Sequence, residues 1–216
     1  MRQVMTLRLH HFFILTDRPT ETGNLLVSMG LKESFSRDHK GQGTSNRRFE
    51  FTNGMLELLY VRDRNEAENG PAGDLRFVDR VKSATASPFG LIFNQTNGTG
   101  LGLPFSGWTY QPDYLKAPNA FHIGDSSEIL EEPLCFYAPF FGTPDESQGT
   151  QEFNTIKNVK ISVARKLLSE TLHSLKAVDG LEIETGDEHV LRLTLVGAGD
   201  RPSWDLRPDL PVIIIW

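Results

Sequence analysis

Two residues near the N-terminus combine reactive side chains with apolar surroundings. His11 lies in LRLHHFFILT, residues 7–16, and Glu57 is the one charged residue of MLELLYV, residues 55–61. An imidazole or a carboxylate on a buried strand costs free energy unless it is paired, hydrogen-bonded or bound to a metal ion. His11 and Glu57 together therefore predict one of three arrangements: two ligands of a metal ion, an acid/base pair, or a hydrogen-bonded couple.

The residues between them include one polar segment, HKGQGTSNRRFEFTNG, from 39 to 54. Its glycines do not indicate a phosphate loop, because Asn46 replaces the third glycine of the dinucleotide fingerprint and a strand follows instead of a helix. Arg47 and Arg48 are neighbours on that strand, so their side chains point to opposite faces and cannot form one phosphate clamp. We predict that Asn46 and one of the two arginines hydrogen-bond to an oxyanion of a bound ligand.

An aromatic segment supplies further candidates for ligand contact. Trp108, Tyr110 and Tyr114 lie in GLPFSGWTYQPDYLKAP, residues 102–118, which we predict to be a long loop. Two interpretations stay open: the aromatic side chains form a lid over a pocket, or they plug the space that a missing helix leaves.

Hydrophobic periodicity indicates the elements that position these side chains. The first part predicts the order β-α-β-β-β, with a strand at 7–16, a helix at 19–30, and strands near 32–38, at 45–51 and at 55–61. The Asn-Gly pair at 53–54 predicts a hairpin turn with positive φ angles. Alternation along the first strand turns His10 away from His11, which shares its face with Leu9, Phe13 and Leu15.

The remaining sequence divides into two further parts. A polar stretch at 63–74 predicts a loop, residues 75–81 indicate a short helix, and strands without a clear helix follow. The last part again reads as β-α-β-β-β. We therefore predict an α+β fold in one compact domain, with a βαβββ unit at 1–64, a helix-poor central β unit at 65–142 and a C-terminal βαβββ-like half-unit at 153–216.

The composition excludes several classes of function. The chain has 216 residues, of which 38% are hydrophobic and 23% charged, so it is a globular chain without an apolar run long enough to span a bilayer. A net charge of −6 argues against a non-specific nucleic-acid surface. Cys135 is the single cysteine, which excludes an intramolecular disulfide, and the first residues lack the features of a signal peptide. We expect a cytoplasmic protein.

The sequence resembles the vicinal-oxygen-chelate superfamily in three motifs: LHHFFILTD, HKGQGTSNRRFEF and NGMLELLYV. That superfamily includes glyoxalase I, bleomycin-resistance proteins and extradiol dioxygenases, and the likeness is greatest to its glyoxalase-like domain proteins. The resemblance implies βαβββ units whose curved mixed sheets surround a cleft. It also implies that His11 matches the first-strand metal ligand and Glu57 the fourth-strand ligand, which together would hold one divalent ion.

The two remaining ligand positions differ from those of such a metal site. If 87–141 is the partner unit, they fall near Phe89 and Tyr137; if 155–216 is the partner, they fall at Asn158 and Ile215. None of these is a usual strong ligand. The substitutes that lie nearby in the sequence are His39, His122, Glu131 and Glu132. The sequence thus supplies half of a metal site. Two possibilities stay open: the protein binds one divalent ion, or it binds none.

Three functions follow from the resemblance and the residues. The first is a metal-dependent lyase, isomerase or dioxygenase that uses His11 and Glu57, with Glu57 as general base. The second is a metal-free protein that sequesters a small, partly aromatic ligand, as bleomycin-resistance proteins do, with Trp108, Tyr110 and Tyr114 stacking on it. The third is a filled cleft that acts through a protein partner. We favour a small-molecule site, leave enzymatic status open, and expect no nucleic-acid or membrane partner; a homodimer stays open.

Overall fold

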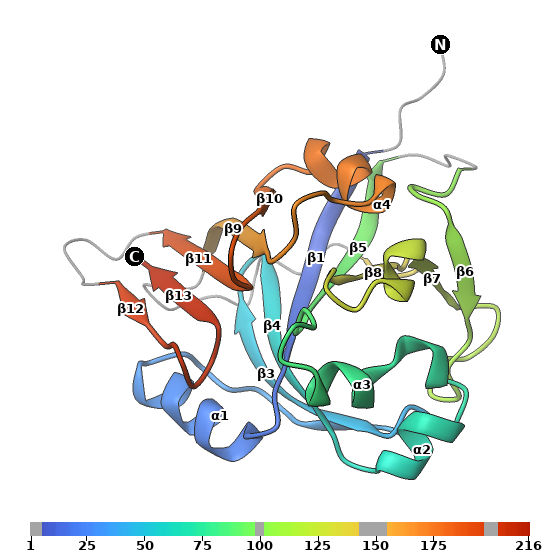
Figure 1. Cartoon of the computed structure of the whole chain (residues 1–216), viewed down its shortest axis with the longest axis horizontal. Coiled ribbons are helices and arrows are strands. Elements are labelled where there is room, and N and C mark those ends of the chain that lie inside the picture. Colours follow the sequence, from blue (N-terminus) through green and yellow to red (C-terminus); the bar gives the residue numbers. More distant parts are fainter. Residues whose placement is uncertain (1–5, 98–101, 143–154, 197–202) are drawn as a thin grey trace.

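Two mixed β-sheets and a few short helices make up the structure (Figure 1). This computed structural model describes residues 6–97, 102–142, 155–196 and 203–216, and the boundary expected between 142 and 153 lies outside them. One sheet has eight strands and the other has five. The α+β fold class is confirmed. None of the described helices combines the length and apolar character that crossing a bilayer requires.

The N-terminal residues supply half of the eight-stranded sheet. They form β1 (Thr6–Leu15), α1 (Pro19–Ser28), β2 (Arg37–His39), β3 (Thr44–Phe51) and β4 (Gly54–Val61). The predicted β-α-β-β-β order is confirmed. The edge strand is shorter than the expected 32–38, because the residues before Arg37 contribute only an isolated bridge between Glu33 and Phe49.

Strands β3 and β4 meet in the hairpin that the Asn-Gly pair predicted. However, neither Asn53 nor Gly54 has a positive φ, so the expected turn geometry is wrong. Asn53 instead uses its side-chain amide, which donates to the carbonyl of Ile156 and accepts from the N–H of Ile156, both at 2.8 Å. A tertiary contact, and not the backbone preference of the residue, therefore explains the asparagine at this turn.

Residues 64–142 contain the other half of the large sheet. They form α2 (Arg64–Asn69), the 3-10 helix η1 (Gly73–Leu75), α3 (Phe77–Lys82), β5 (Phe89–Asn97), β6 (Gly107–Tyr110), β7 (Phe121–Gly124), the 3-10 helix η2 (Asp125–Glu128) and β8 (Leu134–Tyr137). The helix expected at 75–81 is confirmed. Two loop predictions are wrong in part: α2 forms because Asp63 caps it by accepting from the N–H of Glu66, and β6 forms because it pairs with β7.

The strand order of the large sheet joins two similar halves. The order is β2-β3-β4-β1-β5-β8-β7-β6. In each half the first strand lies parallel to the last, β1 beside β4 and β5 beside β8, and β1 pairs antiparallel with β5 at the centre. This is the paired arrangement that the resemblance implied, so the resemblance is confirmed at the level of the fold. The partner of the N-terminal half in this sheet is the 87–141 segment.

The C-terminal residues build the five-stranded sheet. Its elements are β9 (Thr155–Val163), α4 (Glu170–Ser174), the 3-10 helix η4 (Leu175–Ala177), β10 (Leu181–Thr185), β11 (Val190–Val196), β12 (Trp204–Asp205) and β13 (Val212–Ile215). The strand order is β10-β9-β11-β13-β12. This segment begins β-α-β-β like the N-terminal one, yet its strands assemble in an order that neither half of the large sheet has.

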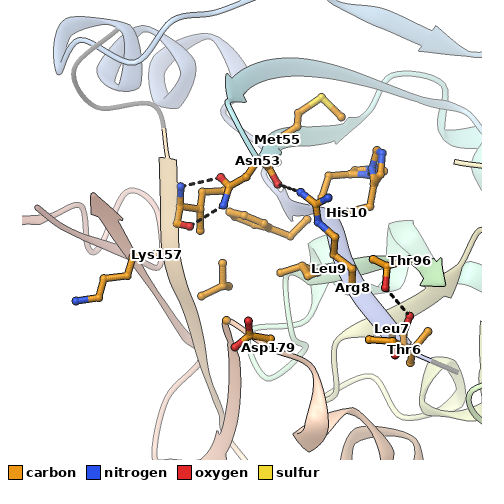
Figure 2. Close-up of a pocket in the computed structure, with 16 residues that line it drawn as sticks. Thr6, Leu7, Arg8, Leu9, His10, Asn53, Met55, Thr96, Lys157 and Asp179 are labelled. Carbon is orange, nitrogen blue, oxygen red and sulfur yellow. Dashed lines mark hydrogen bonds between the residues drawn. The ribbon is translucent and has the colours of Figure 1, made fainter. Parts of the chain in front are cut away.

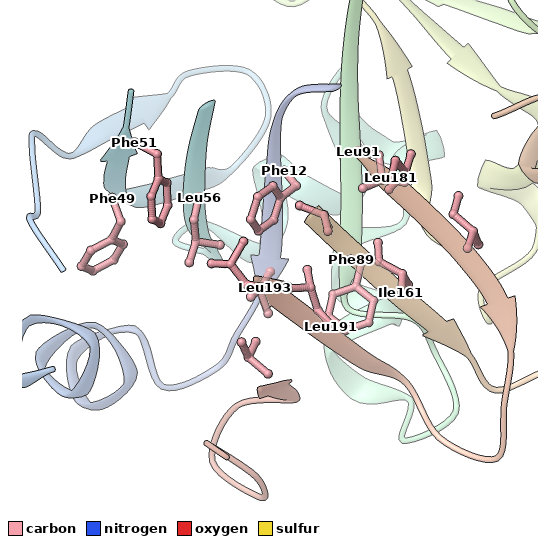
Figure 3. Close-up of a cluster of buried hydrophobic side chains, with 14 of the residues drawn as sticks. Phe12, Phe49, Phe51, Leu56, Phe89, Leu91, Ile161, Leu181, Leu191 and Leu193 are labelled. Carbon is pink, nitrogen blue, oxygen red and sulfur yellow. The ribbon is translucent and has the colours of Figure 1, made fainter. Parts of the chain in front are cut away.

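Alternating side chains of the large sheet form two separate apolar layers. On one face, Phe12 belongs to a cluster with Ile161 and Leu193 of the small sheet (Figure 3). On the other face, Phe13 and Phe136 belong to a second cluster. The small sheet thus covers the first face, and the second face carries His11 of β1 and Glu57 of β4.

Candidate functional site

A β-bulge in β1 sets the positions of both histidines. Leu9 pairs with Phe93 and His11 pairs with Ile92, so the register shifts at His10. Leu9 accordingly packs with the layer against the small sheet, whereas His11 lines a cavity on the other face. The expectation that Leu9 and His11 share a face is wrong, because strict alternation fails at a bulge.

The bulge brings two imidazoles together. The Nδ1 atoms of His10 and His11 lie 2.8 Å apart, so one ring donates and the other accepts. Phe141 packs on both rings, with centroid distances of 4.8 Å to His10 and 5.6 Å to His11. Burial holds the pKa of His11 well below its usual range, and the charges of His10 and Arg48 add to the effect. His11 is therefore neutral at pH 7.

Glu57 faces the same cavity from β4, directly opposite Arg48 on β3. The carboxylate oxygen Oε1 lies 3.1 Å from Nε of Arg48, and the two side chains are 8% and 13% exposed. The guanidinium of Arg48 also lies over the ring of Phe35, 4.6 Å from its centroid. The buried carboxylate thus has a counter-charge within the protein, which reduces the cost of its burial.

A third histidine extends the polar wall. Nδ1 of His39 lies 3.0 Å from the hydroxyl of Thr44, to which Gln42 also donates at 2.8 Å. The carbonyl oxygen of the Gln42 side chain accepts from the hydroxyl of Tyr114 at 2.9 Å. Burial lowers the pKa of His39 to about 4, against the opposing effect of the Glu57 charge. No spacing in the sequence indicated the position of His39, because a strand of only three residues carries it.

These side chains line a cavity of about 100 Å³ with two unlike walls. The polar wall comes from the N-terminal half and consists of His11, Arg37, His39, Gln42, Arg48 and Glu57. The opposite wall is largely aromatic and includes Phe77, Tyr114, Phe121, Phe136 and Phe141. Such a cavity suits a small ligand that has one apolar end and one polar end.

The polar residues predicted from the sequence take different positions. Arg48 lines the cavity. Arg47 points away from it and donates to both carboxylate oxygens of Glu33 at 2.6 Å. Asn46 is fully buried, and its side-chain oxygen accepts from the backbone N–H of Arg37 at 2.9 Å. Direct ligand contact by Arg47 and Asn46 stays a prediction, and Arg48 is the arginine that the cavity offers.

The three predicted aromatic residues also separate. Tyr114 lines the cavity. Tyr110 is buried in the apolar cluster behind it and donates to Gln42 at 3.3 Å. Trp108 is half-buried on β6, and its indole donates to the hydroxyl of Ser127 at 3.1 Å. Burial raises the pKa of Tyr110 and of Tyr114 above the usual range, so both phenols are protonated at pH 7.

The second half of the sheet offers apolar side chains where a metal site needs ligands. Ile92 of β5 pairs with His11 of β1, and Phe136 of β8 pairs with Ile92. Ile92 and Phe136 both line the cavity. Phe89 and Tyr137, the positions expected from the sequence, belong to the layer against the small sheet. The suggested substitutes other than His39 bind elsewhere: His122 to the carbonyl of Phe105, Glu132 to the N–H of Ser169, and Glu131 to Arg165.

The donor set therefore does not fit a divalent cation well. Within the described part of the chain, no group of three or more His, Cys, Asp or Glu side chains converges in the way a metal ion requires. A cation bound to Glu57 would also lie close to the guanidinium of Arg48, and the two like charges would repel each other.

The comparisons with known proteins bear on the fold. No protein-family model and no curated protein matches this sequence. A hypothetical protein from Staphylococcus aureus has a similar structure, with a TM-score of 0.59 and 14% identity over 96% of this chain and 98% of that chain. Weaker likenesses are found to methylmalonyl-CoA epimerase in complex with methylmalonyl-CoA (TM-score 0.41, 9% identity, 65% of this chain and 99% of that one). A mutant of 4-hydroxymandelate synthase from Streptomyces coelicolor gives a TM-score of 0.39 and 12% identity over 97% of this chain and 61% of that one. The first likeness shows that the two chains have a similar fold over nearly their whole lengths. The other two likenesses are too weak to support an argument about fold or activity.

Proposed function

We propose that the cavity between His11, Glu57 and Phe136 binds a small aromatic molecule that carries a hydroxyl or carbonyl group, without a metal ion. The observation that carries this proposal is the division of the cavity into a polar wall and an aromatic wall. This is the binding function that the sequence left open beside a metal-dependent enzyme.

The size and the aromatic wall favour a single ring as the apolar end. An apolar cavity of about 150 Å³ holds one benzene molecule. The cavity here, at about 100 Å³, is of that order. Phe121 has neighbouring rings at centroid distances of 5.6 Å to Phe136 and 5.5 Å to Phe140, so a ligand ring would join an existing aromatic cluster. Stacked and edge-to-face contacts of this kind add roughly 0.5–1.5 kcal/mol each to the burial of apolar area.

The two histidines of the polar wall favour a neutral hydrogen-bonding group as the polar end. The Nδ1 atoms of His11 and His39 contact His10 and Thr44, and the Nε2 atoms make no hydrogen bond to another described residue. Both imidazoles are neutral at pH 7, so each Nε2 either donates or accepts according to its tautomer. A hydroxyl group can serve both roles, and a carbonyl group can accept. Arg48 and Glu57 satisfy each other's charge and can stay paired when such a ligand binds.

The test combines metal analysis with ligand titration. The protein, purified without a metal-binding tag, is incubated separately with Mg²⁺, Mn²⁺, Fe²⁺, Ni²⁺, Zn²⁺ and Ca²⁺, desalted, and assayed for retained ion. Phenol, 4-hydroxybenzaldehyde and benzaldehyde are then titrated calorimetrically with and without EDTA. We expect binding of at least one probe that EDTA does not change.

Variants distinguish this site from non-specific binding. His11→Ala and His39→Ala should each weaken probe binding about five- to tenfold, since each removes one hydrogen bond worth roughly 1 kcal/mol. His173→Ala, at an exposed position on α4, serves as the matched control and should bind like the unmodified protein. Failure of all three probes to bind would overturn the proposal. Near-stoichiometric metal that is lost in His11→Ala would instead favour the metal-dependent enzyme.

A further inference from the structure

A second and larger cavity lies between the two sheets. Its volume is about 380 Å³, within the range of roughly 300–1,000 Å³ that ligand pockets occupy. Its walls come from the start of β1, the β3–β4 turn, the start of β9, and the segment between η4 and β10 (Figure 2). Leu9, Met55 and Ile156 make part of the lining apolar. Of all its lining residues, His11 is the one shared with the first cavity.

Arg8 is a partly buried cation of this cavity, and its charge has no carboxylate partner among the described residues. Its side chain is partly buried and donates one hydrogen bond, from Nη2 to the carbonyl of Asn53 at 2.9 Å. No carboxylate of the described residues lies within ion-pair distance of it, although most other buried or half-buried arginines here are paired, as Arg47 and Arg48 are. A guanidinium has five N–H donors, so Arg8 retains an edge for a carboxylate.

The neighbouring charges define the ligand further. The lining residues Arg8 and Lys157 are cationic, and Asp179 is anionic. Figure 2 shows Arg8 reaching Asn53 at one end of the cavity, with Asp179 toward the other end. The single positive charge of Arg8 at the Asn53 end suits a monoanion better than a dianionic phosphate.

We propose that this second cavity binds a monocarboxylate with a short apolar body. The carboxylate pairs with Arg8 near Asn53, and the apolar body lies along Leu9, Met55 and Ile156. Because the N-terminal half and the small sheet each supply one side of the cavity, a bound ligand contacts both. This site shares only His11 with the one proposed for the aromatic ligand.

The probe for this site is hexanoate, titrated calorimetrically into the full-length protein. Hexanol and hexylammonium carry the same body with no charge and with a positive charge, and hexyl phosphate carries it with a larger negative charge. We expect hexanoate to bind at least tenfold more tightly than hexanol, since a charge-assisted hydrogen bond is worth more than a neutral one. We also expect it to bind more tightly than hexyl phosphate, and hexylammonium not to bind.

Four variants locate the binding. Arg8→Gln should weaken hexanoate binding about tenfold or more, and Asp179→Asn should strengthen it a few-fold by removing the like charge. Arg64→Gln, an exposed arginine on α2 outside the cavity, is the matched control and should leave the affinity unchanged. Circular dichroism of each variant checks folding, and Asp179→Asn tests the site independently if Arg8→Gln does not fold.

Equal affinities for hexanoate and hexanol would overturn the proposal. Loss of binding in Arg48→Met with no change in Arg8→Gln or Asp179→Asn would place the ligand in the first cavity and would overturn it as well.

Discussion

Burial determines the ionisation of the histidines around the first cavity. His11 is 8% exposed and His39 is 6% exposed. The anionic Glu57 raises the pKa of His39, yet desolvation is the larger effect and the net pKa is lowered to about 4. Glu57 also has Arg48 as its own counter-charge at 3.1 Å, so its field at the imidazoles is partly cancelled. The polar wall is therefore set for hydrogen bonding by neutral rings.

Acidification should destabilise the protein through His39. The unfolded chain binds a proton near pH 6.5, whereas the folded chain resists protonation until about pH 4. The contribution of His39 to stability is thus complete above pH 6.5 and is lost as the pH falls from 6.5 to 4. Between pH 7.5 and 4.5, this loss should lower the free energy of unfolding by about 2–3 kcal/mol.

Urea unfolding at these two pH values measures the effect. His39→Gln keeps a side chain that can hydrogen-bond with Thr44. On acidification, its free energy of unfolding should fall by about 2–3 kcal/mol less than that of the unmodified protein. His10 and His11 have lowered pKa values too, so the variant should retain part of the pH dependence. Identical pH dependence in the variant and the unmodified protein would contradict the assignment to His39.

At the scale of elements, the two adjacent arginines of β3 have different roles because their side chains point to opposite faces of the sheet. Arg48 faces the cavity and Glu57, and Arg47 holds α1 against the sheet. The guanidinium of Arg47 donates to Glu33, to the carbonyl of Pro19 at 3.0 Å and to that of Thr20 at 3.1 Å. Arg47 thereby binds the backbone of the first helical turn, where Gly23 leaves room for its guanidinium.

Gly23→Ala should destabilise the protein although alanine is the better helix former. A Cβ at position 23 would overlap the guanidinium of Arg47. We expect a net loss of about 1–2 kcal/mol in thermal or urea unfolding, even though the helix propensity gains about 1 kcal/mol. In an Arg47→Ala background the overlap disappears, so Gly23→Ala should become stabilising by up to about 1 kcal/mol. The same sign of effect in both backgrounds would contradict this account.

At the scale of the whole molecule, the β3–β4 turn joins the two sheets. Asn53 makes two hydrogen bonds with the backbone of Ile156 on β9, and the hydroxyls of Thr52 and Thr155 lie 2.6 Å apart. The small sheet in turn covers the apolar layer of the large one. The turn therefore fixes the edge of the interface that also forms one end of the second cavity.

Asn53→Ala should weaken this junction without altering either sheet. The variant leaves the N–H and the carbonyl of Ile156 without their partners, at a cost of about 2 kcal/mol. Asn53→Asp keeps an acceptor for the N–H of Ile156 and should lie between the alanine variant and the unmodified protein. Hydrogen exchange should increase first at the start of β9. Unchanged exchange there, together with unchanged unfolding free energy, would contradict the role of Asn53.

The amino-acid sequence by itself determined the α+β class, the β-α-β-β-β order of the first half, the hairpin at 52–54 and the burial of His11 and Glu57. These features follow from local periodicity, which records which side chains avoid water. The tertiary structure decided the rest: the bulge that separates Leu9 from His11, the pairing of Glu57 with Arg48, and the apolar Ile92 and Phe136 in the opposite half. Those features depend on the register between strands and on contacts between distant segments, and the hydrophobic pattern of a single strand contains neither.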